Sequence, residues 1–455
     1  MSKLLDQINL DEILEDIRYL LGKDQPHFVV NIIADLHPAD IAEIMSHLTD
    51  DERRAIFNLL SPEAAHEVLA ELEENVKGDV LEGLDTQQIA DMVNEMDSDD
   101  AADLVSELPA DRATEVLEKL EEESSEEIQE LLLYPEDTAG GIMAKEYVAV
   151  NAQLTQKEAI EEIRKKYHDV EDLYYCFVID DFGTLLGMVS LRDLILADPD
   201  TKIRDLMKQD IITVDSDTDQ EEVARLFRKY DLVVAPVVNK QHKLIGRITI
   251  DDIVDVIDEE IEEDLGLIAG TGEEEVLEDS VVQISRSRLP WLILSFFGEF
   301  VSAFILFHFE ATIQQIIASA FFIPMVMAMG GSAGQQSSVI VVRGLATGEI
   351  GFWDIGRRLK REFFVSILNG LVLGFVIFIV VAVWIQDYRL GTILSMSLLA
   401  VVLNASLFGS IVPLLFKKFN IDPALATGPF VATFNDVVGL TIYFTFITLS
   451  FKFLI

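Results

Sequence analysis

Five apolar stretches, each long enough to cross a lipid bilayer, constrain this chain more than any other feature. They lie at about 290–309, 315–342, 363–385, 391–416 and 424–451, and a helical crossing takes roughly 20 residues. Because backbone polar groups must pair with one another inside the membrane, these stretches predict helices. The 455-residue chain is therefore expected to end in a five-helix transmembrane domain at 289–455.

The fifth stretch carries one ionisable side chain near its middle, Asp436, next to Asn435. A charge at that depth costs at least ~2.5–3.5 kcal/mol, so Asp436 is expected to face a partner, the bundle interior or a water-filled path. Gly428, Pro429 and Gly439 are expected to loosen the helix around it, and a carboxylate beside freed carbonyls suits Mg²⁺ or Ca²⁺. The alternative is a structural ion pair, but no Lys or Arg lies centrally in another apolar stretch.

The second stretch contains the polar run AMGGSAGQQSS at 328–338 within its apolar frame. Small residues favour close helix packing, which is one explanation of the run. Ser332, Gln335 and Gln336 add more polarity than packing requires, and this favours a second polar surface at membrane depth.

Charge divides the chain in two. Residues 288–455 hold 8 of the 80 acids and 10 of the 34 basic residues, which leaves 72 acids and 24 basic residues, net −48, for the first 287. Such a half repels nucleic acid and attracts cations. The only cysteine, Cys176, excludes an internal disulfide. No phosphate-binding GxxxxGK[ST] motif supports ATP-driven pumping, and no nucleophile–base pair or His/Cys metal set indicates an enzyme.

Residues 1–135 are predicted to form an acidic all-α superhelical domain built on an internal repeat. A single shift aligns Leu36–Leu72 with Leu84–Leu120, and Ser61 and Asp97 precede predicted helix starts. The acids of this domain cluster at 97–103, and a solvated helix face is the ordinary explanation of such a run.

A second repeat occupies 136–260 and predicts an α/β domain. Each copy opens with a Met-led segment, at Met143 and Met207, and continues as strand, helix, two strands and helix; Gly187 recurs as Gly246. Turns at 181–183 and 239–241 are expected to close the hairpins. Residues 215–226 lack the Gly and Glu of a calcium loop, so Asp219 is expected to cap the helix that follows it.

This second repeat resembles a tandem pair of CBS domains, modules that often hold an adenine nucleotide. The resemblance implies that Asp193 or Asp252 contacts a ribose and that Arg192 contacts phosphate, near Tyr175. ATP is accordingly the expected ligand of the pair.

An acidic helix and a connecting helix are predicted between the CBS pair and the membrane. The run DDIVDVIDEEIEEDL at 251–265 places acids at helical spacing. Like charges at that spacing destabilise a helix, so a basic face or divalent cations are expected to neutralise them. The connecting segment is placed at 261–288, with a further helix from Thr271 to Arg288.

Basic residues give the orientation. They precede the first span, fill 343–361 between the second and third, and recur at Lys417 and Lys418 between the fourth and fifth. By the positive-inside rule the acidic half is cytoplasmic and the C-terminus lies outside. Residues 349–361 are expected to form an interfacial helix.

The whole order resembles the MgtE family of magnesium channels. The segments IDPALATGPFVATFNDVVG at 421–439 and PMVMAMGGSAGQQ at 324–336 are similar to the fifth- and second-span patterns of that family, although the family usually has Asn where this chain has Ser332. The resemblance implies a homodimer in the bacterial inner membrane that passes Mg²⁺ into the cytoplasm and is closed by intracellular Mg²⁺.

The same resemblance implies site residues. The implied pore residues are Asp436, which holds hydrated Mg²⁺, with Ala432, Asn435 and Ser332 near it and Asp422 at the cytoplasmic mouth. The implied regulatory metal ligands are Glu67, Asp99, Asp103, Asp219, Glu221, Asp231, Asp252, Asp255, Glu260, Glu263 and Asp264. Two alternatives remain: a channel for another divalent cation such as Co²⁺ or Ca²⁺, and a membrane-anchored CBS sensor that transports nothing.

Overall fold

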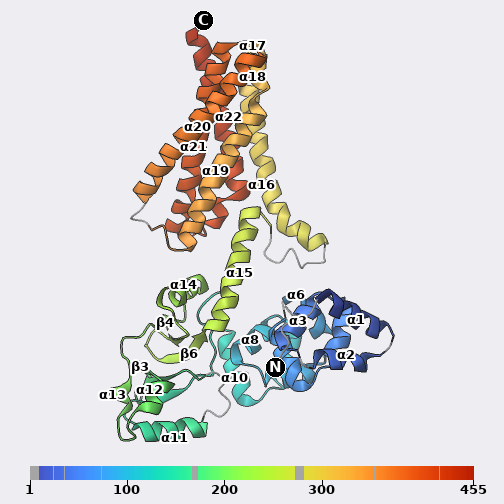
Figure 1. Ribbon diagram of the computed structural model, residues 1–455, viewed down its shortest axis with the longest axis vertical. Helices are drawn as coiled ribbons and strands as arrows, with labels where there is room; N and C mark the ends of the chain where they lie inside the picture. Colours follow the sequence, from blue (N-terminus) through green and yellow to red (C-terminus); the bar gives the residue numbers. More distant parts are fainter. Residues whose placement is uncertain are drawn as a thin grey trace. The chain divides into compact units, whose positions relative to one another are not determined.

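The computed structural model describes residues 10–23, 25–34, 36–72, 74–166, 173–271, 281–351, 355–419 and 421–454. The chain separates into two compact units that meet at Asp258 and Glu259. The first unit holds the helical repeat and an α/β region, and the second holds long apolar helices (Figure 1). Each unit is described by itself.

The helical repeat consists of short helices joined by tight turns. They are α1 (Leu10–Gly22), α2 (Pro26–Ile33), α3 (Pro38–Ser46), α4 (Asp50–Phe57), α5 (Pro62–Ala70), α6 (Glu74–Glu82), α7 (Thr86–Val93), α8 (Ser98–Ser106), α9 (Ala110–Leu117) and α10 (Glu122–Leu131). The starts of α3 to α6 recur as the starts of α7 to α10, at the same constant offset that aligns Leu36 with Leu84. The predicted repeat is therefore confirmed. The Ser61 side chain accepts a hydrogen bond from the backbone of Ala64 and caps α5, as expected of a residue before a helix start.

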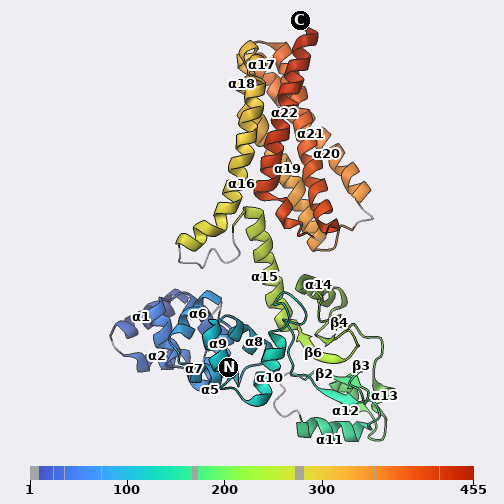
Figure 2. The same ribbon diagram turned by 180° about the vertical axis from the view of Figure 1, so that it is seen from behind.

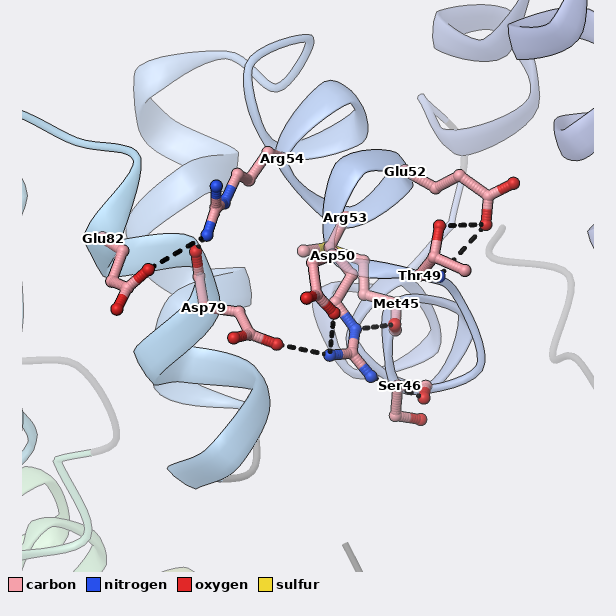
Figure 3. A network of polar contacts seen from close by, with 9 residues as sticks. All are labelled: Met45, Ser46, Thr49, Asp50, Glu52, Arg53, Arg54, Asp79 and Glu82. Atoms are coloured by element: carbon pink, nitrogen blue, oxygen red, sulfur yellow. Dashed lines mark hydrogen bonds and ion pairs between the residues drawn. The ribbon is translucent and has the colours of Figure 1, made fainter. Parts of the chain in front are cut away.

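Two arginines of α4 hold neighbouring helices of the repeat together (Figure 3). Arg53 donates to the backbone carbonyl of Met45 on α3 and to the carboxylate of Asp79 on α6, with an Nη1–Oδ2 distance of 2.7 Å. Arg54 reaches Glu82 on the same helix α6, with an Nη2–Oε2 distance of 3.2 Å. The Arg53 side chain is only 12% exposed, so its contacts lie inside the stack and stabilise it more than an exposed ion pair would.

Two three-stranded sheets of identical topology form the α/β region. The first holds β1 (Ala149–Asn151), β2 (Tyr175–Ile179) and β3 (Leu185–Ser190), and the second holds β4 (Val214–Asp215), β5 (Val234–Val238) and β6 (Leu244–Thr249). In each sheet the first strand is parallel to the second, and the second is antiparallel to the third. The helices are α11 (Gln156–Lys166), α12 (Leu191–Leu196), α13 (Ile203–Leu206) and α14 (Gln220–Tyr230).

The two sheets confirm the second predicted repeat. At the offset that aligns Gly187 with Gly246, β2, β3 and α12 recur as β5, β6 and the start of α15 (Ile250–Ala269). The hairpin turns begin differently from expectation in the first copy: the side chain of Asp180, rather than Asp181, accepts the turn hydrogen bonds, as Asn239 does in the second. Asp219 caps α14 by accepting from the backbone of Glu221, so that prediction is confirmed.

Each Met-led segment pairs with the other copy. Ala144 bridges Arg247 and Lys208 bridges Met188. A side chain at Gly246 would meet the sulfur of Met143 at 2.6 Å, so glycine is required for this close approach. The copies therefore form one interlocked pair.

The second unit contains five helices long and apolar enough to cross a membrane among the described residues. The helices of this unit after α15 are α16 (Val281–His308), α17 (Glu310–Gln315), α18 (Ile317–Ala320), α19 (Ile323–Ala346), α20 (Ile355–Trp384), α21 (Tyr388–Lys418) and α22 (Gly428–Leu454), with a short 3₁₀ helix, η3 (Ala424–Ala426), before α22. Helix α21 packs against α20, α19 and α22, and α16 packs along α22 (Figure 2).

Several helices run across the boundaries that were expected between the CBS pair and the membrane spans. The acidic helix and the first part of the connecting segment are one helix, α15, while the last part of that segment belongs to α16, which continues into the first span. Residues 272–280 of the connecting segment lie outside the described residues. Of the expected interfacial helix at 349–361, residues 355–361 begin the third span within α20, and 352–354 lie outside the described residues.

Candidate ion-binding sites

The fifth span differs from expectation in where its backbone is irregular. Helix α22 is continuous through Gly439, so the predicted loosening around Asp436 is wrong. The irregular backbone lies at the start of the helix, where Gly428, its first residue, has a φ of +42° that favours glycine. There the Asp422 carboxylate accepts a hydrogen bond from the backbone of Ala424 (2.8 Å). Ser338 of α19 donates to the carbonyl of Ala426 (2.8 Å), which ties the second span to the start of the fifth.

Asn435 and Asp436 lie side by side in the chain but face different neighbours. Asn435 is 2% exposed, and neither its Oδ1 nor its Nδ2 has a hydrogen-bond partner among the described residues. Its amide lies against Gly334 of α19, where a β-carbon would overlap it. Asp436 is half-buried. Burying an amide without a hydrogen-bond partner costs free energy. At the depth of Asn435 the bundle therefore contains polar groups whose hydrogen bonds the described residues do not supply.

Helix α19 presents polar side chains that its own chain does not cover. Ser332, Gln335 and Gln336 are exposed although they lie in the middle of a span, while Ala432 of α22 is half-buried. Their spacing of three and four residues places them on one face of the helix. The predicted second polar surface at membrane depth is therefore present on α19.

The Asp436 carboxyl has an acidic neighbour that the sequence analysis did not single out. Glu299 lies on α16 near the middle of the first span, and its carboxyl is close enough to that of Asp436 to share a hydrogen bond. No basic side chain is recorded against Asp436 among the described residues. Asp436, the single ionisable residue near the middle of its own span, therefore has a second carboxyl beside it from another span. The sequence signal that singles out Asp436, one ionisable residue in the middle of an apolar span, is also present at Glu299 and could have identified it.

A second acid inside the bundle holds α20 to α19. Glu362 is 7% exposed; its carboxylate accepts from the Ser337 hydroxyl of α19 (2.6 Å) and pairs with Arg358 one turn away (3.3 Å). Ser337 belongs to the same polar run as the exposed face of α19. The buried hydrogen bond between Ser337 and Glu362 therefore ties the second span to the third.

In the first unit, acids of the helical repeat and of α15 approach one another. Desolvation raises the pKa of Asp99 on α8 well above its ordinary value, and the charges of Asp252, Asp100 and Asp97 raise it further. Desolvation also raises the pKa of Asp255, with Glu71 and Asp252 adding to the effect. The predicted ligands Asp99, Asp252 and Asp255 are therefore brought into one electrostatic neighbourhood.

The pKa of Asp100 is raised to about 6 by desolvation, which the Lys77 ammonium offsets only in part, with Asp252, Asp97 and Glu71 repelling. Asp100 and Glu71 were not among the predicted ligands, although both lie in acidic runs. Among the described residues no group of three or more His, Cys, Asp or Glu side chains is arranged to hold one ion directly. Hydrated Mg²⁺ keeps several waters and needs few direct ligands, so the neighbourhood suits such an ion.

The other predicted ligands are spread over several elements. Exposed positions are held by Glu67 on α5, Asp103 on α8 and Asp231 after α14. Half-buried positions are held by Glu221 on α14 and by Glu260, Glu263 and Asp264 on α15. Asp219 is used as a helix cap. The expectation that Asp252, Asp255, Glu260, Glu263 and Asp264 share one helix is confirmed.

The predicted nucleotide residues gather at the end of the first sheet. Tyr175 of β2 pairs with Ser190 at the end of β3, and the Ser190 hydroxyl accepts from the backbone of Asp193. Arg192 lies beside Asp193 on α12, and both are exposed. In the second copy the position equivalent to Asp193 is Asp252, which accepts from the backbone and hydroxyl of Thr249 (2.9 and 2.7 Å). The two copies therefore offer equivalent acids at equivalent strand ends.

These features define a class of membrane protein. It has five transmembrane helices, two of which carry a carboxyl side chain near their middle, and it also has an acidic helical repeat and a CBS pair. Family comparisons agree. Residues 36–137 match the MgtE intracellular N domain, 139–200 and 203–259 match the CBS domain, and 323–446 match MgtE, described as a divalent cation transporter.

Curated relatives match over most of their length. The magnesium transporter MgtE of Bacillus subtilis is 34% identical over 97% of this chain and 98% of its own. That of Thermus thermophilus is 38% identical over 69% of this chain and 70% of its own. A crystal structure of the cytosolic domain of the Mg²⁺ channel MgtE in complex with ATP is similar to 53% of this chain, covering 99% of that structure at 34% identity and a TM-score of 0.50. The chain belongs to the MgtE family.

Proposed function

We propose that this protein is a Mg²⁺-selective channel that lets Mg²⁺ enter the cytoplasm down its electrochemical gradient. The observation that carries the proposal is Asp436, a carboxylate at the middle of the fifth span, in a chain whose relatives are named magnesium transporters. Moving a divalent cation through 100 mV releases about 4.6 kcal/mol, at about 2.3 kcal/mol per charge. A passive pore therefore suffices and no ATP hydrolysis is needed.

The orientation follows from the basic residues. Arg286 and Arg288 lie in the first turns of the first span, the basic residues of 343–361 lie from the end of the second span to the start of the third, and Lys417 and Lys418 end the fourth. The positive-inside rule places these ends, and with them the acidic first unit, in the cytoplasm, and it places the C-terminus outside. Mg²⁺ that enters then meets the acidic half directly.

The pore is formed by a homodimer in this proposal. Ser332, Gln335 and Gln336 expose polar groups at membrane depth on α19, where lipid contact is unfavourable. A second copy related by twofold symmetry covers these groups on both chains at once. Single Gln335→Cys substitution supports a test by cross-linking: a disulfide-linked dimer is expected, and a purely monomeric active protein contradicts the arrangement.

Intracellular Mg²⁺ closes the channel through the acids of the first unit. Asp99 of α8 and Asp252 of α15 repel each other, and a divalent cation between the two helices converts this repulsion into attraction. The arrangement that brings the acids together then binds Mg²⁺ more tightly than an open arrangement does, so Mg²⁺ stabilises it.

Helix α15 carries the effect to the membrane. At its other end, a side chain at Gly270 would meet Pro429 at 2.8 Å, and Gly428 lies against the carbonyl of Ile268. Both contacts are with the first residues of α22, the span that carries Asp436. A helix of 20 residues is about 30 Å long and stiff, so movement at the acidic end is transmitted to the start of the fifth span.

ATP binds the CBS pair in this proposal and adjusts the closed state. The support is the arrangement of Tyr175, Arg192 and Asp193 at one strand end, and the similarity to an MgtE cytosolic domain crystallised with ATP.

The function is tested by flux into liposomes that contain the purified full-length protein. Mg²⁺ uptake is expected to exceed Cl⁻ uptake because a central carboxylate repels anions, and the proposed Mg²⁺ selectivity requires that it also exceed Ca²⁺ uptake. Uptake of Ca²⁺ or Co²⁺ in preference to Mg²⁺ indicates a channel for another cation. Absence of any flux from a folded protein contradicts transport and favours a sensor.

A further inference from the structure

The first and fifth spans pack in a constant register. Gly298 of α16 lies against Thr433 of α22, and Phe309, the residue after α16, stacks on Phe444 with ring centroids 5.5 Å apart. The two pairs have the same separation in sequence, so the two helices run parallel without slipping. The register places Asp436 beside the turn of α16 that begins at Glu299.

The contact face of α16 is a narrow seam. The residues of α16 that its own chain covers include Trp291, Ser295, Gly298, Ser302 and Ile305, with alternating spacings of four and three. Glu299 lies at the edge of this seam and is exposed. Its carboxyl therefore reaches Asp436 while remaining open to whatever occupies the uncovered side.

An unsatisfied polar group lies inside the same seam. Ser302, one turn beyond Glu299, is 3% exposed and its hydroxyl has no hydrogen-bond partner among the described residues. In the constant register it is level with Val437, next to Asp436. A membrane helix pair gains nothing from a buried hydroxyl without a partner, so this group indicates a polar occupant beside the two carboxyls.

We propose that Glu299 is a second carboxylate of the permeation site and holds the hydrated divalent cation together with Asp436. The inference rests on the proposed function and extends its ion site from the second and fifth spans to the first. Two ionised carboxylates in contact at membrane depth repel each other strongly. A hydrated Mg²⁺ between them neutralises both, and its bound waters donate hydrogen bonds to nearby oxygens, the Ser302 hydroxyl among them.

Two carboxylates also select by charge. A monovalent cation leaves the pair with a net negative charge, whereas a divalent cation balances it, so removal of either acid weakens discrimination against Na⁺ or K⁺. Loss of a group that contacts a metal through its waters typically lowers metal affinity about 10- to 100-fold. The same range is expected here for the Mg²⁺ concentration that gives half-maximal uptake.

The test compares Glu299→Gln with Glu310→Gln in liposome flux assays. Glu310 is an exposed acid on α17 whose side chain accepts a hydrogen bond from Gln314 of its own helix, so it is a matched control. Glu299→Gln is expected to raise the half-maximal Mg²⁺ concentration about 10-fold or more and to admit monovalent cations, while Glu310→Gln retains wild-type behaviour. Glu299→Asp is expected to recover part of the selectivity, which a purely structural role does not predict.

Two further measurements separate the possible failures. Wild-type protein without divalent flux contradicts the proposed function, whereas a transporting wild type with an unchanged Glu299→Gln variant overturns this inference alone. If Glu299→Gln fails to fold, Glu299→Cys in a Cys176→Ala background is labelled with a charged thiol reagent. Mg²⁺ is expected to slow that labelling, and a rate independent of Mg²⁺ overturns the inference.

Discussion

Glu362 gives a sharp test of how the second span is held in place. Its carboxylate lies 3.3 Å from Arg358 and 2.6 Å from the Ser337 hydroxyl. At an effective dielectric of about 20, that ion pair is worth about 5 kcal/mol before desolvation is subtracted. Breaking a buried pair on one side typically costs about 3–5 kcal/mol. The Arg358 side chain is 16% exposed and has a route to the interface, so we expect about 2–4 kcal/mol for Glu362→Gln.

The assay is thermal unfolding of the full-length protein in detergent. A loss of about 3 kcal/mol corresponds to a drop of about 6–12 °C for a unit of this size. Lys360→Gln, an exposed charge on the same helix, is the control and is expected to change the melting temperature little. Arg358→Gln combined with Glu362→Gln is expected to recover most of the loss, because no unpaired charge remains.

Two results refute this reasoning. A Glu362→Gln variant that melts at the same temperature as the Lys360→Gln control shows that the Glu362 carboxylate does not hold the second span against the third. A double variant as unstable as the sum of the two single losses shows that the two residues act independently.

Four further predictions follow from other parts of the chain. Gly409→Ala places a β-carbon on a backbone carbonyl of α19 and is expected to destabilise the folded protein by about 1–3 kcal/mol. Gly331→Ala has open space around the added carbon and is expected to stabilise the helix by about 0.5–1 kcal/mol through its higher helix propensity. The same unfolding assay measures both. The raised pKa of Asp100 means that its charged form is disfavoured in the folded state, so without Mg²⁺ the protein is expected to gain stability as pH falls from 7 through about 6 to 5. The stability added by Mg²⁺ is expected to shrink over the same pH range, because protons compete with the cation for the carboxylates. Calorimetry with EDTA or with Mg²⁺ at each pH checks both expectations. Asp252→Asn is expected to leave the channel open at millimolar cytoplasmic Mg²⁺ in patch recordings, and closure at the wild-type concentration contradicts the bridging scheme. ATP is expected to raise the melting temperature and Asp193→Ala to erase the shift, and no shift at millimolar ATP contradicts nucleotide binding.

The sequence predicts the repeats well because each is a local pattern copied along the chain. One constant offset matches the starts of four successive helices, and a second offset matches two strands and the helix after them. Capping chemistry is also local, so the role of Asp219 was predictable from its own neighbours. The five apolar spans follow from length and composition alone.

What the sequence does not predict depends on which helices meet. Glu299 is a single acid within an apolar stretch and Glu362 directly precedes another, and only packing of α16 on α22 and of α20 on α19 brings them to Asp436 and Ser337. Gly439 lies within a continuous helix because neighbouring spans support it, against its low helix propensity. Approach of Glu71 and Asp100 to α15 likewise depends on tertiary contacts between elements far apart in the chain.

The central claim is that Asp436 holds the permeating Mg²⁺, and one measurement tests it most directly. Mg²⁺ uptake is followed in liposomes with wild-type protein and with Asp436→Asn, which keeps the size of the side chain and removes its charge. Light scattering in detergent checks that both proteins have the same assembly state. We expect the variant to lose Mg²⁺ uptake or its preference over monovalent cations. Unchanged, Mg²⁺-selective uptake by the folded variant contradicts the assignment of Asp436 as the ion site.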